Sequence, residues 1–172
     1  MYGPSVMPYQ PDGVWMTVYS GESWATSTGE DQFRRGLYTF LKRTSPYPSF
    51  ISFDASSREV CLVDRIRTNT PLQALTTLND PVYLEAAKHL STLMQKEGAG
   101  DSKKIISYGY KKLMLKNPSE EKVVALEKLY KEALQNFNKK PAEAAKFMAV
   151  NASDLKDPSL TSKAAYMVVA NA

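Results

Sequence analysis

The sequence changes character at residue 70. Before this point it is rich in prolines, glycines and β-forming residues, and it starts with the extended lead-in GPSVMPYQPDG, residues 3–13. At residues 70–73, TPLQ has the form of a capping box, with proline at the first helical position. Asp80 and Pro81 then end that helix and cap the next. This pattern predicts a mainly α fold: a helical bundle of about five to six helices from residue 70, preceded by an irregular segment.

The helical part divides at its caps and prolines. The expected helices run from Pro71 to about Leu78, Pro81 to about 95, Asp101 to about Leu115, Ser119 through Phe137, Pro141 to about Val150, and Pro158 onward. Val82, Ala86, Leu90 and Leu93 are expected to form the apolar stripe of the second helix. The last helical pattern still runs at Ala172, which leads us to expect that the natural chain continues.

The first 69 residues are expected to hold two or three short β-strands, at 14–20, at 36–43 and, as the third, at 50–54, because β-formers or alternating residues occur there. A short helix is the alternative for 36–43. The length of the chain predicts a single domain fragment, with a loop and short-strand segment at 1–69 and a helical part at 70–172.

The basic residues are divided unevenly between these two parts. Residues 1–70 contain six arginines and one lysine, whereas residues 71–172 contain fifteen lysines and no arginine. Arginine is a planar fork that suits fixed polar partners, so structured polar contacts are expected in the first part. The lysines alternate with glutamates along helices, which argues against a nucleic-acid partner.

Cys61 and His89 are the single cysteine and the single histidine of the chain. They exclude an internal disulfide and a multi-cysteine zinc site, and no C-x-x-C-H motif attaches haem, so no metal or cofactor is expected in this segment. Cys61 stands between apolar residues and is expected to be a small buried hydrophobe. His89 is expected at a partly exposed helix position. No apolar run approaches the roughly 20 residues of a membrane span.

The carboxylates near the arginines have two interpretations. Asp54, Glu59 and Asp80 are candidates for a general acid and base, as in glycoside hydrolysis. The favoured alternative is that such carboxylates form ion pairs with arginines, so that Arg58, Arg65 and Arg67 clamp a loop over residues 54–70 to the helices. The polar residues of this structural or ligand-facing cluster are Arg34, Arg35, Arg43, Asp54, Arg58, Glu59, Arg65, Arg67, Asn69, Gln73 and Asn79.

Aromatic residues also gather in the first part. Exposed aromatics beside arginine can stack on sugar rings or bases, but packing of a small core is the favoured interpretation. The aromatics in question are Trp15, Tyr19, Trp24, Tyr38, Phe40 and Phe53. Capping and turn roles account for Asn69 and Asn79 without a ligand.

Four stretches carry a family resemblance: GPSVMPYQPDGVW, RRGLYTFLKRTSPYP, FDASSREVC and RTNTPLQALTTLNDPVYLEAAKHL, in that order. They closely resemble the bacterial domain-of-unknown-function family 1553 (DUF1553), the C-terminal module of large proteins widespread in planctomycetes and their relatives. The family pattern maps onto Trp15, Arg34, Arg35, Tyr38, Arg43, Asp54, Arg58, Glu59, Cys61, Thr68, Asn69, Thr70, Pro71, Gln73, Asn79, Asp80 and Pro81. The serine pair in FDASSRE departs from the Pro-containing turn expected there.

The resemblance implies an exported, periplasmic or extracellular protein of several domains. Members commonly carry a cytochrome c domain upstream, so haem c is expected in other domains of the full-length protein, and those domains are the expected partners. The family brings no established activity. The favoured function is therefore a non-catalytic structural or interaction module. The alternatives are part of a polysaccharide-acting enzyme or carbohydrate-binding protein, and a lysine-rich docking surface for a haem domain.

Overall fold

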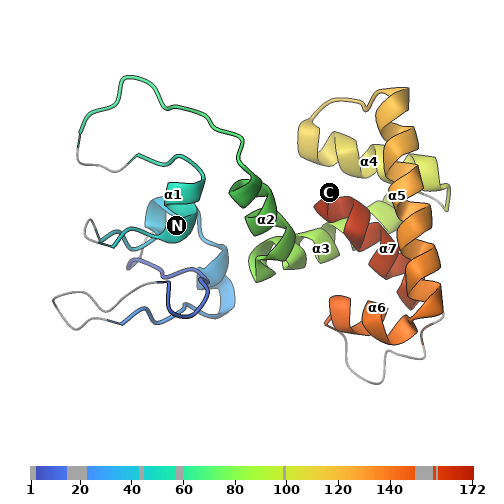
Figure 1. Ribbon diagram of the computed structural model, residues 1–172, viewed down its shortest axis with the longest axis horizontal. Helices are drawn as coiled ribbons and strands as arrows, with labels where there is room; N and C mark the ends of the chain where they lie inside the picture. The colour runs from blue at the N-terminus through green and yellow to red at the C-terminus, as the bar shows by residue number, and fades with distance from the viewer. Residues whose placement is uncertain are drawn as a thin grey trace. The chain divides into compact units, whose positions relative to one another are not determined.

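The computed structural model describes residues 3–14, 23–42, 45–56, 60–98, 100–149, 157 and 159–172. Figure 1 shows a mainly helical chain, and α2 to α7 follow residue 70 as six helices in these described ranges, which confirms the helical part of the prediction. The chain divides into two compact units, Met1–Thr76 and Thr77–Ala172. Helix α2, Pro71–Asn79, contains the boundary between them. That the chain is a single domain stays a prediction.

In its described residues, the first unit is held by short turns rather than by strands. The regular elements found there are two 3₁₀ helices, η1 (Gly29–Phe33) and η2 (Gly36–Tyr38), the α-helix α1 (Pro48–Ser52) and the start of α2. The strand expected at 50–54 is wrong, because Pro48 opens a helical turn there. The strand expected at 14–20 lies, apart from Val14, outside the described residues.

The strand expected at 36–43 is also wrong. The described part of this segment begins as η2 and then forms one isolated parallel bridge between Val6 and Thr39. The Val6 N–H donates to the Tyr38 carbonyl at 2.9 Å, and the Phe40 N–H donates to the Val6 carbonyl at 2.7 Å. Prolines at positions 4 and 8 flank Val6 on the partner segment, and a proline has no N–H with which to continue a ladder.

Aromatic rings form the centre of the first unit. Trp24 stacks on Tyr47 with ring centroids 5.5 Å apart, and Phe50 meets Tyr47 edge-on at 5.4 Å. Both polar ends are satisfied, because the Trp24 indole N–H donates to the Pro8 carbonyl at 2.8 Å and the Tyr47 hydroxyl donates to the Tyr9 carbonyl at 2.7 Å. Of the aromatics for which core packing was predicted, Trp24 is confirmed by these contacts, whereas Trp15 and Tyr19 lie outside the described residues.

The second unit is a helical bundle around its last helix. Its elements are α3 (Pro81–Glu97), α4 (Ser102–Met114), α5 (Glu120–Lys139), α6 (Pro141–Phe147) and α7 (Leu160–Asn171). Helix α7 packs against α3, α5 and α6 (Figure 1). It is buried on most of its sides, with Ala164 and Ala165 fully enclosed. Within the described ranges, no helix combines the length and apolarity that crossing a bilayer requires.

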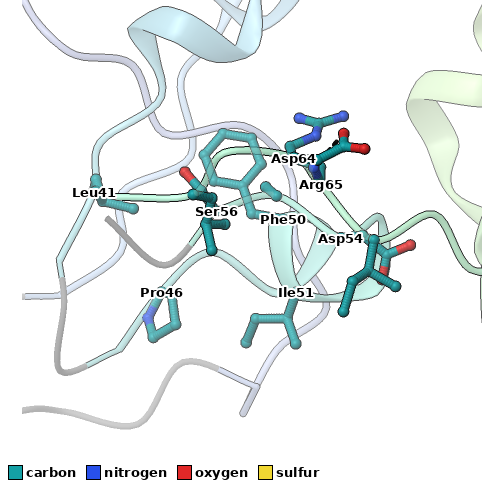
Figure 2. A pocket seen from close by; sticks show the side chains of 11 residues that line it. Leu41, Pro46, Phe50, Ile51, Asp54, Ser56, Asp64 and Arg65 are labelled. Carbon is teal, nitrogen blue, oxygen red and sulfur yellow. Dashed lines mark hydrogen bonds between the residues drawn. The ribbon is translucent and has the colours of Figure 1, made fainter. Parts of the chain in front are cut away.

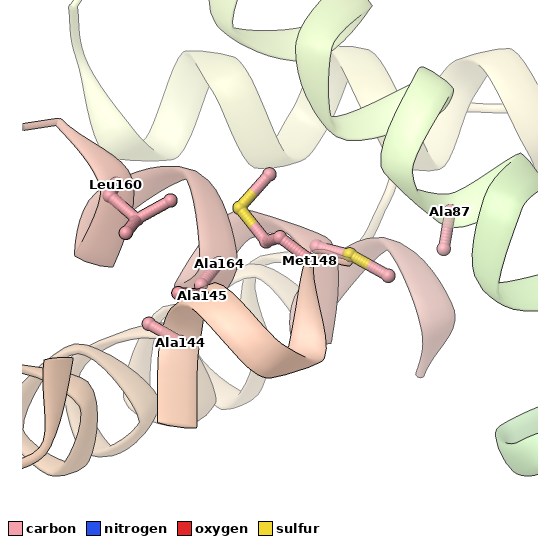
Figure 3. Close-up of a cluster of buried hydrophobic side chains, with 7 residues drawn as sticks. Ala87, Ala144, Ala145, Met148, Leu160 and Ala164 are labelled. Carbon is pink, nitrogen blue, oxygen red and sulfur yellow. The ribbon is translucent and has the colours of Figure 1, made fainter. Parts of the chain in front are cut away.

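Two apolar clusters hold this bundle together. The first joins α3, α6 and α7 through small side chains such as Ala87, Ala144 and Ala164, which let the helices approach closely (Figure 3). The second contains Met94 and Tyr166, together with residues of α4. In the first cluster, the alanines permit close helix contacts, and the flexible side chains of Met148 and Met167 are suited to the irregular space beside them.

The buried face of α3 differs from the predicted stripe. Ala86 is exposed, whereas Ala87, Ser91 and Met94 are buried. Ser91 is fully enclosed because its hydroxyl donates to the Lys88 carbonyl at 2.8 Å. A serine whose hydroxyl is hydrogen-bonded can be buried between helices. The buried face of α3 therefore lies about one residue away from the stripe that the apolar residues alone predict.

Most of the predicted caps are confirmed. The Asp80 carboxylate accepts from the Val82 N–H at 2.9 Å at the start of α3, and Asp101 accepts from the Lys103 N–H at 3.0 Å at the start of α4. Ser119 takes the N-cap position of α5, but its side chain makes no capping hydrogen bond. The acidic first turn of α5 still complements its helix dipole.

Candidate functional site

An aspartate ends helix α1 where glycine is usual. The Ala55 N–H donates to the Phe50 carbonyl at 2.8 Å and the Asp54 N–H donates to the Ile51 carbonyl at 3.3 Å, which together make a Schellman motif. Its left-handed residue is Asp54, with φ of 56°. A non-glycine residue in this conformation carries backbone strain, so its side chain is expected to have a role that glycine would not fill.

That role is to hold the far end of a long loop. The Asp54 Oδ2 atom accepts from both the backbone N–H and the hydroxyl of Thr68, each at 2.7 Å. Gln73 donates to the Thr68 hydroxyl oxygen at 3.1 Å and to the Ser52 carbonyl at 2.8 Å. Gln73 also completes the predicted capping box, since its Oε1 accepts from the Thr70 N–H at 3.1 Å. We call these contacts of Asp54, Thr68 and Gln73 the Asp54 clasp.

The clasp keeps Asp54 ionised. The backbone N–H of Thr68 is the main cause that lowers the pKa of Asp54 below its ordinary value, followed by the Thr68 hydroxyl. Gln73 and the positive charge of Arg65 lower this pKa further. A carboxylate held in this way is a good hydrogen-bond acceptor and a poor proton donor at neutral pH.

The described part of the loop closed by the clasp turns apolar side chains outward. Four of them, which we call the apolar loop, are Val60, Leu62, Val63 and Ile66. Val63 is fully exposed, and Ile66 keeps 80% of its surface in solvent. Four aliphatic side chains exposed within seven residues form a concentrated apolar surface rather than scattered single residues.

A pocket of about 370 Å³ lies between this loop and α1. It is lined by Leu41, Pro46, Phe50, Ile51, Asp54, Ala55, Ser56, Leu62, Asp64, Arg65 and Ile66. In the view of Figure 2, Leu41 and Pro46 lie on the opposite side of the pocket from Asp54, Asp64 and Arg65. The Asp64 carboxylate accepts from the Arg65 backbone N–H at 2.8 Å. The pocket thus joins an apolar wall to two carboxylates and one guanidinium.

Arg34 is the arginine that behaves as the sequence predicted. Its guanidinium donates to the Pro4 carbonyl at 3.0 Å and lies 4.2 Å from the centre of the Tyr38 ring. A longer contact of 3.8 Å joins it to the Asp31 carboxylate. Arg34 therefore ties the lead-in to the turn around η1 and η2, through a carbonyl and a ring more than through an acid.

The arginine clamp expected on residues 54–70 is wrong for two of its three members. Arg65 and Arg67 are exposed, and neither guanidinium has a hydrogen bond or ion pair with another described residue. The same holds for Arg35. Arg43, Arg58 and Glu59 lie outside the described residues. In the described part of this loop, the hydrogen bonds that Asp54 accepts come from the N–H and hydroxyl of Thr68 rather than from a guanidinium.

The remaining candidates are spread over the chain. Asp80 belongs to the second unit, where it caps α3, and Asn79 is the last residue of α2. Asn69 is exposed beside the clasp. Cys61 is exposed, so the expectation of a buried thiol is wrong: its apolar neighbours point to solvent as well. His89 is exposed as expected, with its Nε2 atom 4.0 Å from the Glu85 carboxylate.

Sequence reasoning assigned no role to Thr68, although this residue completes the clasp. Its partner Asp54 stands fourteen positions earlier, so no local spacing rule connects the two. A useful signal would have been an aspartate directly after a short helix, at a position where glycine normally ends it. Throughout the described ranges, no three acidic, histidine or cysteine side chains gather as metal ligands.

Comparison with known proteins gives a family and nothing narrower. A family model described as "PSD1: Protein of unknown function (DUF1553)" matches residues 1–130, which covers the Asp54 clasp, the apolar loop and helices α1 to α4. No curated protein and no solved structure matches the chain.

Proposed function

The chain belongs to the PSD1 (DUF1553) family of proteins of unknown function, and from this premise we propose that it is a non-catalytic interaction module of a larger exported bacterial protein. The observation that carries the proposal is the exposed apolar loop beside the pocket of the first unit. Concentrated apolar surface with a polar border is typical of protein–protein contact sites.

The Asp54 clasp supports the proposal because it fixes both ends of the loop. Asp54 follows α1 directly and Thr68 lies three residues before α2, so the two hydrogen bonds between them close the loop at its base. A loop closed in this way loses less conformational entropy when it binds than a free one would. The apolar side chains thus lie on a loop that is ordered before the partner binds.

The charges at the pocket indicate what the partner carries. Asp54 and Asp64 contribute two carboxylates to its lining, against the single guanidinium of Arg65. A partner surface with an aliphatic or aromatic side chain and a neighbouring lysine or arginine would complement this border. We propose that the partner is another domain of the same parent protein, namely the cytochrome c domain that the family resemblance implies, in the periplasm or outside the cell.

The polysaccharide-acting alternative has less support in the described residues. Asp54 is engaged by Thr68 and holds its charge, which suits a structural acceptor better than a general acid. Trp24 stacks on Tyr47, so the protein itself covers one face of this ring. A sugar platform requires an aromatic face that is open to the ligand.

Site-specific photo-cross-linking in the full-length protein tests the proposal. A benzoylphenylalanine in place of Val63 is expected to form a cross-link that maps by mass spectrometry to a single surface of another domain of the parent protein. The matched control is the same probe at Lys128, which is exposed on α5 of the second unit. The cross-link from position 63 is expected to disappear when Ile66→Asp is added, because a buried charge opposes docking.

Two results would contradict the proposal. One is a yield at position 63 no higher than at position 128. The other is a cross-link to polysaccharide instead of protein, which would support the carbohydrate alternative.

A further inference from the structure

Helix α4 and the turn that follows it carry many cations and no anion. Residues 102–119 contain five lysines and no acidic residue, whereas α5 contains four lysines and four glutamates. The five lysines are all exposed: Lys103, Lys104, Lys111, Lys112 and Lys116. Among the described residues, no carboxylate forms an ion pair with Lys104, Lys111 or Lys112. The positive charge of this stretch is therefore not neutralised by its own helix.

The stability of α4 does not account for all of this charge. The two lysines of the last turn complement the helix dipole, but Lys103 and Lys104 stand in the first turn, where a cation opposes it. From α5, the Lys122 ammonium donates to the Tyr110 hydroxyl oxygen at 2.9 Å, which places a further positive charge beside α4. A surface that gathers so many cations is expected to attract an anionic partner.

An exposed apolar side chain stands among these lysines. Leu115 is 88% exposed and ends α4 in a left-handed conformation, with φ of 55°, at a position where glycine is usual. A leucine there carries backbone strain and, at this exposure, gains little from packing within its own unit. Leu113 and Met114 precede it and are exposed as well, and Figure 1 shows the connection from α4 to α5 at the edge of the bundle. The end of α4 is thus an apolar tip between Lys112 and Lys116.

The chemistry of this tip suits a lipid surface better than an acidic protein. Arginine is the residue that matches the fixed carboxylates of a protein partner, and residues 71–172 contain none. The flexible stem of lysine can lie along apolar material while its ammonium stays at the level of the head groups. Apolar side chains flanked by lysines bind at the interface of anionic membranes, through apolar burial together with attraction to the charged lipids.

We propose that the C-terminal end of α4 docks onto an anionic lipid surface, with Leu115 at the boundary of the acyl chains and Lys111, Lys112 and Lys116 against the lipid phosphates. The lysines supply an attraction that salt weakens, and the leucine supplies apolar burial that salt does not weaken. The two contributions can therefore be measured separately. This inference concerns the second unit alone and does not depend on the function proposed for the first.

Co-sedimentation of the chain with lipid vesicles tests the charge. The protein is expected to bind vesicles of equal parts phosphatidylglycerol and phosphatidylcholine, to bind pure phosphatidylcholine at least about tenfold more weakly, and to be released by salt. Lys111→Gln combined with Lys112→Gln is expected to weaken binding to the anionic vesicles by about thirtyfold. The matched control is Lys128→Gln with Lys139→Gln, which removes the same charge from exposed positions of α5 and is expected to change binding by less than about twofold.

The apolar contact is tested by Leu115→Ser, which is expected to weaken binding by about tenfold and to leave its salt dependence unchanged. Val63→Ser, in the apolar loop of the first unit, is expected to leave vesicle binding as it is, which separates this proposal from the function proposed above. All the substituted side chains are exposed, so the far-UV circular dichroism of each variant is expected to match the wild type. The proposal is overturned if pure phosphatidylcholine is bound as tightly as the anionic mixture, if the two lysine pairs have equal effects, or if Leu115→Ser binds like the wild type. The last result would indicate a purely electrostatic partner, such as an acidic protein.

Discussion

The Asp54 carboxylate lies 2.7 Å from both the backbone nitrogen and the hydroxyl oxygen of Thr68. The backbone of Asp54 is left-handed at the end of α1, and its side chain thereby fixes Thr68, which lies shortly before α2. The loop between them includes the most exposed apolar side chain of the described residues, Val63. The order of this surface therefore depends on a single carboxylate.

Replacing Asp54 separates its two contributions. Asp54→Gly removes the hydrogen bonds to Thr68, but glycine adopts the left-handed backbone without strain. Asp54→Ala removes the same hydrogen bonds and keeps the backbone strain. We expect both variants to speed hydrogen exchange at the Thr68 amide by about tenfold, and the alanine variant to melt at the lower temperature. Exchange at wild-type rates in both variants would show that the clasp does not hold the loop.

Acid is expected to weaken the start of α7. The hydrogen bond from Lys163, at 2.6 Å, is the main cause that lowers the pKa of Asp157, and the hydroxyl and N–H of Ser159 lower it further. Because the unfolded chain binds this proton at a higher pH than the folded one, stability is present above about pH 4 and is lost as the pH falls. The free energy of unfolding, followed by urea titration from pH 7 to 2, is expected to fall less steeply in Asp157→Asn.

Asp12→Asn provides the comparison for this experiment, since Asp12 is exposed in the lead-in. The free energy of unfolding of this variant is expected to fall with pH in parallel with that of the wild type. If the Asp157→Asn curve does so as well, the contacts of Asp157 do not contribute to stability.

The stacked pair in the second unit is expected to be worth several kilocalories. Tyr166 is 5% exposed and its ring centre lies 4.3 Å from that of Tyr130. Tyr166→Ala would leave a cavity at the centre of α7 and is expected to cost about 3–5 kcal/mol of unfolding free energy, measured by urea denaturation. Tyr166→Phe keeps the stack and is expected to stay within about 1 kcal/mol of the wild type. Equal losses in the two variants would assign the stability to the hydroxyl instead.

Two glycines permit close contacts that a methyl group would disturb. A Cβ atom on Gly98 would lie 2.6 Å from the Ile105 backbone, whereas one on Gly109 would meet the movable end of Met94. We expect Gly98→Ala to cost about 1–3 kcal/mol. Gly109→Ala is expected to cost less, because Met94 can shift and alanine favours the helix by about 1 kcal/mol. Chemical denaturation of both variants measures the order, and the reverse order would be inconsistent with these contacts.

The thiol of Cys61 is expected to react in the native protein. Cys61 is exposed within the apolar loop, so a thiol reagent should label it stoichiometrically without denaturant. The rate is expected to match that of the unfolded chain within about tenfold, because no packing has to open first. Labelling that requires urea would show that the loop is folded inward in solution.

Several features of the site could be predicted because they are local. The capping box of Thr70 and Gln73 and the cap at Asp80 connect atoms two or three residues apart, and such contacts are formed wherever a helix begins. The exposure of Cys61 could not be predicted in this way. Its apolar neighbours are typical of a core segment, and their position depends on the rest of the unit.

The amino-acid sequence by itself determined where helices α2 to α6 begin, because proline and the capping side chains act on the backbone next to them. Only the tertiary structure decided that Asp54 pairs with Thr68 instead of with an arginine, and that α3 buries Ala87 and Ser91 instead of Ala86. The physical reason is the distance along the chain. Which polar groups meet and which helix face is enclosed depend on the packing of segments far apart in sequence, and no local pattern encodes that packing.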